Sequence, residues 1–131
     1  TLVDIDAGAL KAAQQGVDAL GLERKVKYLE SDVSQWDEWP EISCDLLVTN
    51  PPWGVQTPQA DRAFLVTAFA SPASVIHLMH NAKATHVSGL AADAGWTGEV
   101  LMEADFALPA AYEHHTTRRG TTRVACWRFT R

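Results

Sequence analysis

The sequence predicts an α/β fold whose sheet is mostly parallel and ends in an antiparallel hairpin. Short apolar runs alternate with stretches in which apolar residues recur at helical spacing, a pattern typical of strand–helix–strand units. The last two apolar runs have no helical pattern between them, so we expect these two strands to pair as a hairpin. The chain has 131 residues, 47% of them hydrophobic, which predicts a single domain over residues 1–131 with a packed core.

The first part of the chain contains three predicted strands and a helix between the first two. Asp6 is expected to cap this helix, and Gly21 to end it. The third strand, Leu-Leu-Val-Thr, is an apolar run and is predicted to be buried. The strands are predicted at residues 2–5, 26–29 and 46–49. Between the last two, the polar and aromatic residues predict a loop, with a helical turn as an alternative.

The second part alternates in the same way. Asp61 is expected to open a helix that ends before Pro72, and Val87 begins another apolar stripe at helical spacing. Strands are predicted at residues 75–79, 100–108 and 122–129. The loop between the last two strands holds Tyr112 and His114. Because no cysteine or carboxylate stands at ligand spacing near this histidine, no metal site is expected there.

The composition excludes several classes of protein. A net charge of −5 argues against a uniformly basic nucleic-acid-binding protein, although Arg24, Lys25 and Lys27 form a local basic cluster. Cys44 and Cys126 are too few and too far apart to indicate a disulfide scaffold or a zinc site, so a reducing, cytoplasmic setting is expected. No stretch is long and apolar enough to cross a membrane, and no secretory leader is visible.

The most informative stretch is Asn50-Pro51-Pro52-Trp53-Gly54, which follows the third predicted strand. It is expected at the carboxyl edge of the sheet, where ligands bind in open α/β folds. The Asn50 side chain and the Pro51 carbonyl offer two oxygen acceptors, because proline has no N–H. Trp53 adds a flat apolar face. Two acceptors beside a stacking surface suit a planar group that carries an amine.

Polar residues follow three successive predicted strands, and we expect Asp4, Asp32 and Asn50 to line up along one edge of the sheet. A carboxylate after an early strand commonly accepts hydrogen bonds from ribose hydroxyls, and Asp32 is placed to accept one from an adenine amine. Each residue also has a plainer explanation. Asp4 alone is equally well explained as a helix-start acid, Asp32 as a turn former, and the Asn-Pro-Pro stretch as a strand-ending turn.

Together these residues form an ordered series of motifs that covers nearly the whole chain. The series is Val3-Asp4-Ile5-Asp6 with Ala9-Leu10, Asp32-Val33, Asn50-Pro51-Pro52-Trp53-Gly54, Asp61 with Ala63-Phe64-Leu65, and Leu108-Pro109-Ala110 with Tyr112 and His114. It resembles the Rossmann-like class I S-adenosylmethionine-dependent methyltransferases that carry an Asn-Pro-Pro-aromatic motif. Within that class it is most similar to the small archaeal and eukaryotic enzymes that methylate adenine N6 in small-subunit ribosomal RNA, the methyltransferase-like 5 type.

The resemblance implies a cofactor, a substrate and roles for particular residues. The cofactor would be S-adenosylmethionine, and the implied cofactor-binding residues are Asp4, Ile5, Asp32, Val33 and Asn50. The implied catalytic motif is Asn50, Pro51, Pro52 and Trp53. The implied contacts to an rRNA substrate are Trp53, Tyr112 and His114.

The chain departs from this family in two places. Trp53 stands where the family usually has Phe, and it retains a stacking surface. The family's first strand and its glycine-rich cofactor turn have no counterpart, so we expect an N-terminally truncated domain. By resemblance, the absent strand lies between the strands at residues 2–5 and 46–50. The resemblance also implies a partner, a small zinc-binding activator protein that pairs with the edge strand at residues 26–29.

Three functions remain open from the sequence. The first is methylation of adenine N6 in structured RNA, which Leu108-Pro109-Ala110 and Tyr112 favour. The second is methylation of a protein glutamine at N5, because the Asn-Pro-Pro-aromatic motif also serves that acceptor. The third is an inactive fragment or binding module, which the missing glycine-rich turn favours.

Overall fold

The structure is a computed structural model and describes residues 1–52, 60–107 and 121–131. Residues 53–59 and 108–120, which include Trp53, Tyr112 and His114, lie outside the described part. The chain divides into two compact units, Thr1–Ile42 and Ser43–Arg131. We describe each unit by itself. Among the described residues, no helix has both the length and the apolar character that crossing a bilayer requires.

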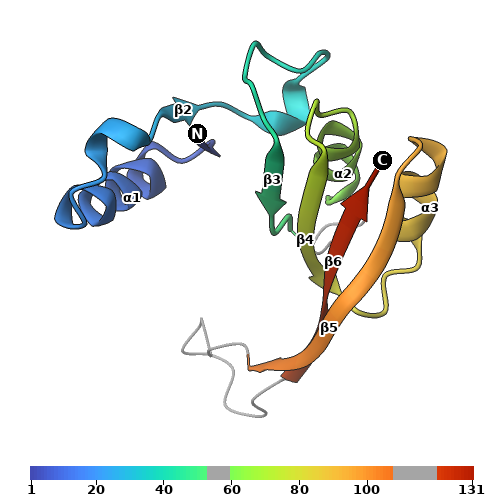
Figure 1. Ribbon diagram of the computed structural model, residues 1–131. Coiled ribbons are helices and arrows are strands. Elements are labelled where there is room, and N and C mark those ends of the chain that lie inside the picture. The colour runs from blue at the N-terminus through green and yellow to red at the C-terminus, as the bar shows by residue number, and fades with distance from the viewer. Residues whose placement is uncertain (53–59, 108–120) are drawn as a thin grey trace. The chain divides into compact units, whose positions relative to one another are not determined.

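The first unit is a parallel pair of strands joined by a helix (Figure 1). Its elements are β1 (Leu2–Asp4), α1 (Ala7–Ala19), β2 (Tyr28–Glu30) and two short 3₁₀ turns, η1 (Glu23–Lys25) and η2 (Val33–Gln35). Asp6 caps α1 as predicted, because its side chain accepts a hydrogen bond of 2.7 Å from the Gly8 amide. Gly21 follows the helix with a φ of 67°, a left-handed conformation that favours glycine.

The second unit is a four-stranded sheet with two helices on one face (Figure 1). Its elements are β3 (Leu46–Thr49), α2 (Arg62–Phe69), β4 (Val75–Asn81), α3 (His86–Asp93), β5 (Thr97–Ala107) and β6 (Thr121–Thr130). The strand order is β3-β4-β6-β5, with β3 parallel to β4 and the other neighbours antiparallel. The predicted C-terminal hairpin is therefore confirmed.

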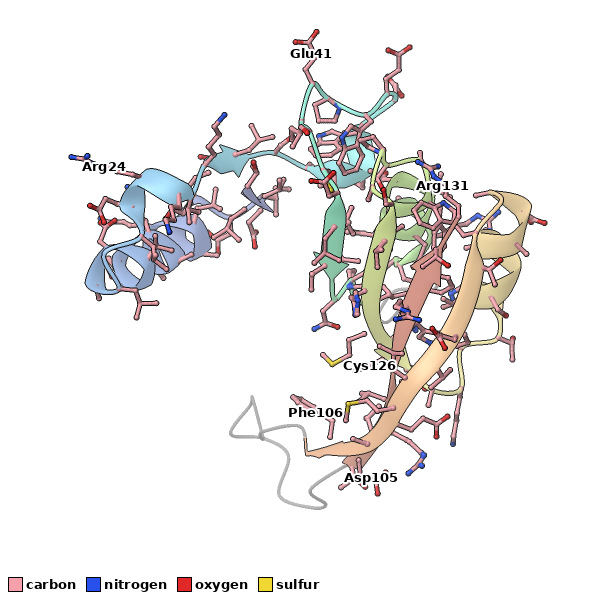
Figure 2. All side chains as sticks on the ribbon, in the orientation of Figure 1. Arg24, Glu41, Asp105, Phe106, Cys126 and Arg131 are labelled. Carbon is pink, nitrogen blue, oxygen red and sulfur yellow. The ribbon has the colours of Figure 1, made fainter. Side chains whose placement is uncertain are left out.

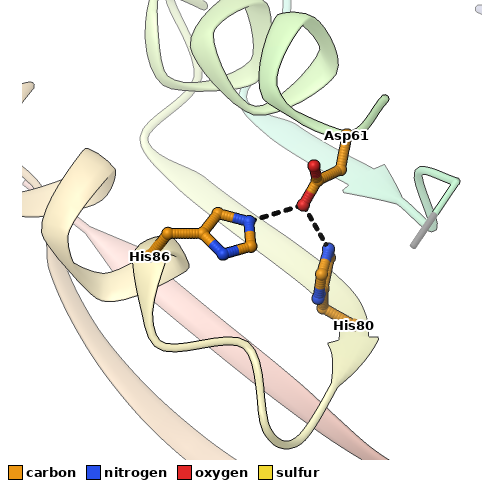
Figure 3. Close-up of side chains that lie close together, drawn as sticks. All are labelled: Asp61, His80 and His86. Carbon is orange, nitrogen blue, oxygen red and sulfur yellow. Dashed lines mark hydrogen bonds and ion pairs between the residues drawn. The ribbon is translucent and has the colours of Figure 1, made fainter. Parts of the chain in front are cut away.

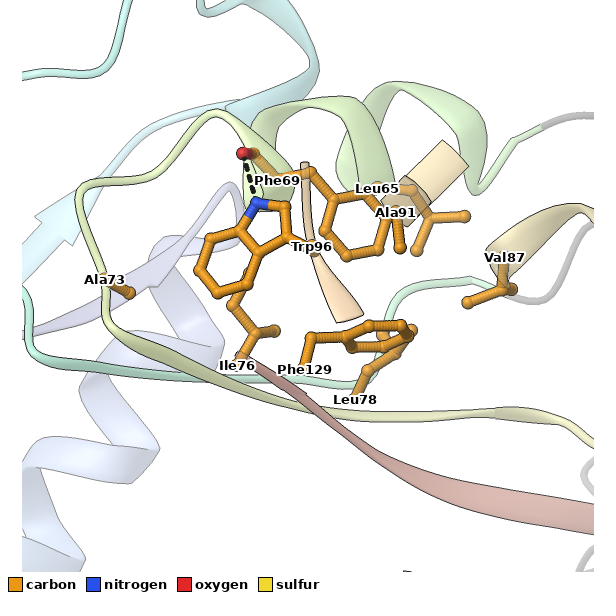
Figure 4. Packing of buried hydrophobic residues seen from close by; sticks show 9 residues of the cluster. All are labelled: Leu65, Phe69, Ala73, Ile76, Leu78, Val87, Ala91, Trp96 and Phe129. Carbon is orange, nitrogen blue, oxygen red and sulfur yellow. Dashed lines mark hydrogen bonds between the residues drawn. The ribbon is translucent and has the colours of Figure 1, made fainter. Parts of the chain in front are cut away.

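The core of this unit lies between the sheet and the helices α2 and α3 (Figure 4). Phe69 packs edge-on against Phe129 with ring centroids 5.1 Å apart, and the buried Trp96 donates its indole N–H to the Phe69 carbonyl at 2.8 Å. The core side chains are Leu65, Phe69, Ala73, Ile76, Leu78, Val87, Ala91, Trp96 and Phe129.

The C-terminal residue closes one end of this core. Arg131 follows the end of β6 (Figure 2). Its guanidinium lies 4.6 Å from the centre of the Trp96 ring and donates to the Ser71 carbonyl at 2.7 Å. The two contacts combine a cation–π interaction with a charge-assisted hydrogen bond. They attach the end of β6 to the turn that follows α2.

The structure corrects several expectations about strands. For example, β4 extends to Asn81 rather than residue 79, and β5 begins at Thr97 rather than residue 100. The strand predicted at residues 26–29 is observed at Tyr28–Glu30. The pairing with β1 begins where the Lys27 carbonyl accepts a hydrogen bond from the Leu2 amide, so the strand starts after Lys27. The strand at Leu46–Thr49 has the predicted bounds but is not buried. The side chains of Leu46 and Val48 are 54% and 73% exposed. In the second unit β3 is an edge strand, and its outward residues face away from α2 and α3.

Candidate functional site

The Asn50–Pro51 step lies at the carboxyl end of β3, as the sequence predicts. β3 ends at Thr49, and Thr49 pairs with Leu78 of the parallel strand β4. Asn50 is exposed, whereas Pro51 is buried and Pro52 is exposed again. This arrangement places an amide side chain at the solvent boundary, directly before a carbonyl group in a buried residue. The structure does not describe the position of Trp53.

Three polar side chains meet beside this edge, in a cluster formed by Asp61, His80 and His86 (Figure 3). Asp61 precedes α2, His80 lies near the end of β4, and His86 begins α3. The Asp61 Oδ2 atom is 2.9 Å from His80 Nε2 and 2.5 Å from His86 Nε2. Asp61 and His80 are buried, with exposed fractions of 3% and 1%, while the His86 side chain is 45% exposed.

The protonation of this cluster follows from its geometry. Burial raises the pKa of Asp61, but hydrogen bonds and charge from His86 and His80 outweigh burial and hold this pKa below its ordinary value. Asp61 is therefore an ionised acceptor at neutral pH, and both Nε2 atoms must carry the hydrogens that it accepts. His80 Nδ1 is buried and has no hydrogen-bond partner among the residues that the structure describes. A neutral His80 leaves only a lone pair unpaired there, whereas a charged His80 would leave a buried N–H unpaired.

In the first unit, the two predicted carboxylates follow neighbouring parallel strands. Asp4 ends β1, and Asp32 comes shortly after β2. Each makes a local hydrogen bond through Oδ1, Asp4 to the Asp6 amide at 2.9 Å and Asp32 to the Ser34 amide at 2.9 Å. The helix-start and turn-forming explanations of these residues are therefore observed. Their proposed contacts to a cofactor remain a prediction.

Each of these carboxylates has a second oxygen that could accept a hydrogen bond from a nucleoside cofactor. Among the described residues, no group donates a hydrogen bond to the second oxygen of Asp4 or of Asp32. Both oxygens remain available as acceptors for ribose hydroxyls or an adenine amine. Ile5 is 65% exposed, and Val33 is partly buried. An exposed Ile5 beside Asp4 offers an apolar surface to a purine ring.

The structure brings together some predicted residues and leaves others apart. Asp4 and Asp32 lie in the first unit and Asn50 in the second, so the alignment of all three along one edge remains a prediction. The sequence indicated Asp61 only as a helix start and did not single out His86. One signal was present: Asp61, His80 and His86 each lie at an end of a predicted element on the carboxyl side of the sheet.

Comparisons with known proteins agree with the fold. No protein-family model matches the chain. The rRNA N6-adenosine-methyltransferase METTL5 of Danio rerio is 29% identical over 129 residues, which are 97% of this chain and 62% of that protein. The chain thus spans less than two thirds of this relative's length.

Solved structures show the same arrangement of helices and strands. A Pyrococcus horikoshii protein, PH1948, named as a candidate RNA methyltransferase, matches with a TM-score of 0.80 and 24% identity over 98% of this chain and 61% of that chain. The 23S rRNA methyltransferase ErmE matches with a TM-score of 0.63 and 14% identity over 98% of this chain and 50% of that chain. The Mtq2 protein of E. cuniculi, solved in complex with Trm112, matches with a TM-score of 0.54 and 12% identity over 98% of this chain and 82% of that chain. The chain therefore has part of the class I S-adenosylmethionine-dependent methyltransferase fold, and its sequence is similar to that of an rRNA N6-adenosine-methyltransferase.

Proposed function

We propose that this chain belongs to an enzyme that transfers a methyl group from S-adenosylmethionine to adenine N6 in structured RNA of the small-subunit rRNA type. One observation carries the proposal. The Asn50-Pro51 step lies at the carboxyl end of β3, in a chain similar over 97% of its length to an rRNA N6-adenosine-methyltransferase. Residues 1–131 are proposed to form a single methyltransferase domain that lacks the first strand of its sheet.

The proposed chemistry depends on how Asn50 and Pro51 hold the acceptor nitrogen. An aromatic amine is a weak nucleophile because its lone pair is delocalised into the ring. When the Asn50 side-chain oxygen and the Pro51 carbonyl accept hydrogen bonds from both amine hydrogens, the nitrogen is favoured in a pyramidal form. Its lone pair is then no longer delocalised into the ring and is directed at the methyl group of the cofactor. S-adenosylmethionine supplies an already activated methyl group, so the residues of the chain contribute positioning and electrostatics. Because Pro51 is buried, a hydrogen bond from the amine to its carbonyl would be stronger than one in water.

Cofactor binding is proposed for the residues that follow β1 and β2. Asp4 would accept hydrogen bonds from ribose hydroxyls through its second oxygen, and Asp32 would accept one from the adenine amine. Ile5 and Val33 would lie beside the purine. This assignment is supported by the exposed position of Asp4 and by the parallel pairing of β1 with β2, which brings the ends of both strands to one edge. Asn50 is proposed to contact both the cofactor and the acceptor.

The target base would have to leave its stack to reach such a site. Trp53 is proposed to stack on the extruded base, a contact worth about 1–3 kcal/mol. Tyr112 and His114 are proposed to hold the flanking RNA, where unstacked bases and phosphates are the usual points of contact. A cytoplasmic location is part of the same proposal.

The experiment that tests this function follows a labelled methyl group. The full-length protein that contains this chain is incubated with labelled S-adenosylmethionine and either small-subunit rRNA or a release-factor peptide. We expect label in the RNA, recovered as N6-methyladenosine. Label in the peptide alone would contradict the proposal.

That second outcome would support the alternative function, methylation of a protein glutamine at N5. One observation favours it, namely the structural likeness to Mtq2, whose complex with Trm112 is named as responsible for methylation of the eRF1 translation termination factor. The TM-score of 0.54 is lower than the value of 0.80 for the candidate RNA methyltransferase. The RNA function is therefore placed first.

A partner protein is proposed at the outer edge of β2. The Lys27 carbonyl accepts a hydrogen bond from the Leu2 amide, and the Ser31 amide donates one to the Asp4 carbonyl. Backbone groups alternate in direction along a strand, so those of Tyr28 and Glu30 point away from β1. An incoming strand of a small zinc-binding activator protein could pair with them. Glu30→Pro removes one outward N–H, and we expect it to abolish co-purification with the activator while far-ultraviolet circular dichroism stays unchanged. Undiminished co-purification would contradict this edge as the binding site.

A further inference from the structure

We propose that Asp61, His80 and His86 form a hydrogen-bonded clamp that positions the Asn50–Pro51 step. This inference rests on the proposed function, since it assigns positioning residues to the same site. The three side chains come from three different elements and meet at one carboxylate oxygen (Figure 3). The clamp thus ties the carboxyl end of β4 to the starts of α2 and α3.

The strand register connects the clamp to the acceptor motif. Thr49 of β3 pairs with Leu78 of β4. β3 ends at Thr49, and Pro51 follows this last pair of the ladder by two residues, as His80 follows Leu78 on β4. Fixing the end of β4 at His80 therefore limits how far the backbone at Pro51 can shift.

The Asp61 side chain is not explained by helix capping. Asp61 is the N-cap residue of α2, yet its carboxylate makes no capping hydrogen bond, and only its backbone carbonyl accepts from the Leu65 amide at 2.9 Å. The carboxylate instead points to the two imidazoles. A buried carboxylate is costly unless it is hydrogen-bonded, and here two N–H donors satisfy it.

The same residue types also suit a divalent metal ion, because two imidazoles and a carboxylate offer three donor atoms within 4.8 Å of one another. The structure favours the clamp for two reasons. Separations of 2.9 and 2.5 Å between nitrogen and oxygen are hydrogen-bond distances. A metal on His80 Nε2 would leave the proton on Nδ1, which is buried and has no partner in the described part of the chain, whereas histidines that bind metals usually donate this proton to an acceptor.

The first arm of the test needs no enzymatic activity. Nitrogen-15 NMR of the imidazoles in the full-length protein reads the protonation of each ring nitrogen. We expect a hydrogen on Nε2 of both His80 and His86, and a shift of both Nε2 signals in Asp61→Asn. Stoichiometric binding of added Zn²⁺ with loss of both Nε2 protons would overturn the clamp and assign a metal site. This arm stands even if the protein proves not to methylate RNA.

The second arm separates positioning from simple stability. We expect His86→Ala to lower kcat about tenfold or more, through misplacement of the acceptor, while KM for S-adenosylmethionine changes less than about twofold. His86→Gln retains an N–H near the Nε2 position and should recover most of the lost kcat. His77→Ala is the control, because His77 lies on the same strand and on the opposite face from His80. Unchanged kcat in His86→Ala, or an equal loss in His77→Ala, would overturn the proposal.

Discussion

Asn50 is the residue on which the proposed chemistry depends most directly. Removing one of two acceptors from the amine should cost transition-state stabilisation rather than cofactor binding. We expect Asn50→Ala to lower kcat about 100-fold or more, by analogy with the loss of one preorganised hydrogen-bonding group in other enzymes. Steady-state kinetics on RNA measures the effect.

The matched control is Asn81→Ala. Asn81 is the other asparagine at the carboxyl end of a strand, and its side-chain oxygen accepts from the Lys83 amide at 2.9 Å, a local turn contact. We expect this variant to retain kcat within about threefold, since a local cap affects stability more than chemistry. An equal loss in both variants would show that Asn50 has no special role.

Asp61 should make the stability of the fold depend on pH. Burial raises its pKa, but the opposing effects of His86 and His80 lower it below the ordinary value. The carboxylate therefore stabilises the fold fully above the ordinary pKa of about 4, and this contribution is lost as pH falls through the lowered pKa.

We expect Asp61→Asn to lower the free energy of unfolding by about 1–3 kcal/mol at pH 7, because it disturbs a buried hydrogen-bonded network. The difference from the wild type should shrink at acid pH. Urea denaturation at several pH values measures it. Asp93→Asn, at an exposed position at the end of α3, should change the free energy by less than about 0.5 kcal/mol. A difference that grows toward acid pH would contradict the ionised state of Asp61.

Among the elements, β5 and β6 pack tightly at the pair formed by Gly98 and Phe129. A Cβ atom at this glycine would lie 2.3 Å from the Phe129 ring. We expect Gly98→Ala to destabilise the second unit by about 1–3 kcal/mol, because the buried ring has no free space to move into. Gly89→Ala in α3 is the control. Beyond the helix's own backbone, no atom of the described residues lies within 4 Å of its added Cβ, so alanine should stabilise the helix by about 0.5–1 kcal/mol. Thermal unfolding of both variants checks this, and equal stability would contradict it.

The elements also show what the sequence could and could not predict. Asp6 and Gly21 carry local signals for the limits of α1, and the absence of a helical pattern before β6 predicted the hairpin. The burial of β3 was predicted wrongly. An apolar run indicates a strand, but it does not show which other elements cover that strand. Leu46 and Val48 are exposed because they lie on the face of the sheet opposite α2 and α3, whereas Leu47 points to the core.

The candidate site was predictable where its residues are adjacent in the sequence. The Asn50–Pro51 step is a continuous motif after a strand, so its place at the carboxyl end of β3 follows from local signals. The contacts of Asp61 with His80 and His86 span 19 and 25 residues. Such long-range contacts depend on how α2 and α3 pack against the sheet, and no local pattern reports that packing.

For the whole molecule, the proposed absence of a first strand and glycine-rich turn leads to a prediction about cofactor binding. We expect calorimetry with S-adenosylmethionine to show weak or no binding to the 131-residue chain, and clear binding once an N-terminal segment with that turn is present. Asp4→Ala in the longer protein should weaken binding, since it removes the proposed acceptor for ribose. Tight binding to the 131-residue chain alone would contradict the prediction.

The contact between Gly98 and Phe129 has an evolutionary consequence. Because a ring on one strand occupies the volume that a side chain on the other would need, the two positions are not free to diverge separately. Natural relatives that carry alanine or serine at the position of Gly98 should carry a smaller residue at the position of Phe129, and the two changes should arise together in their lineages.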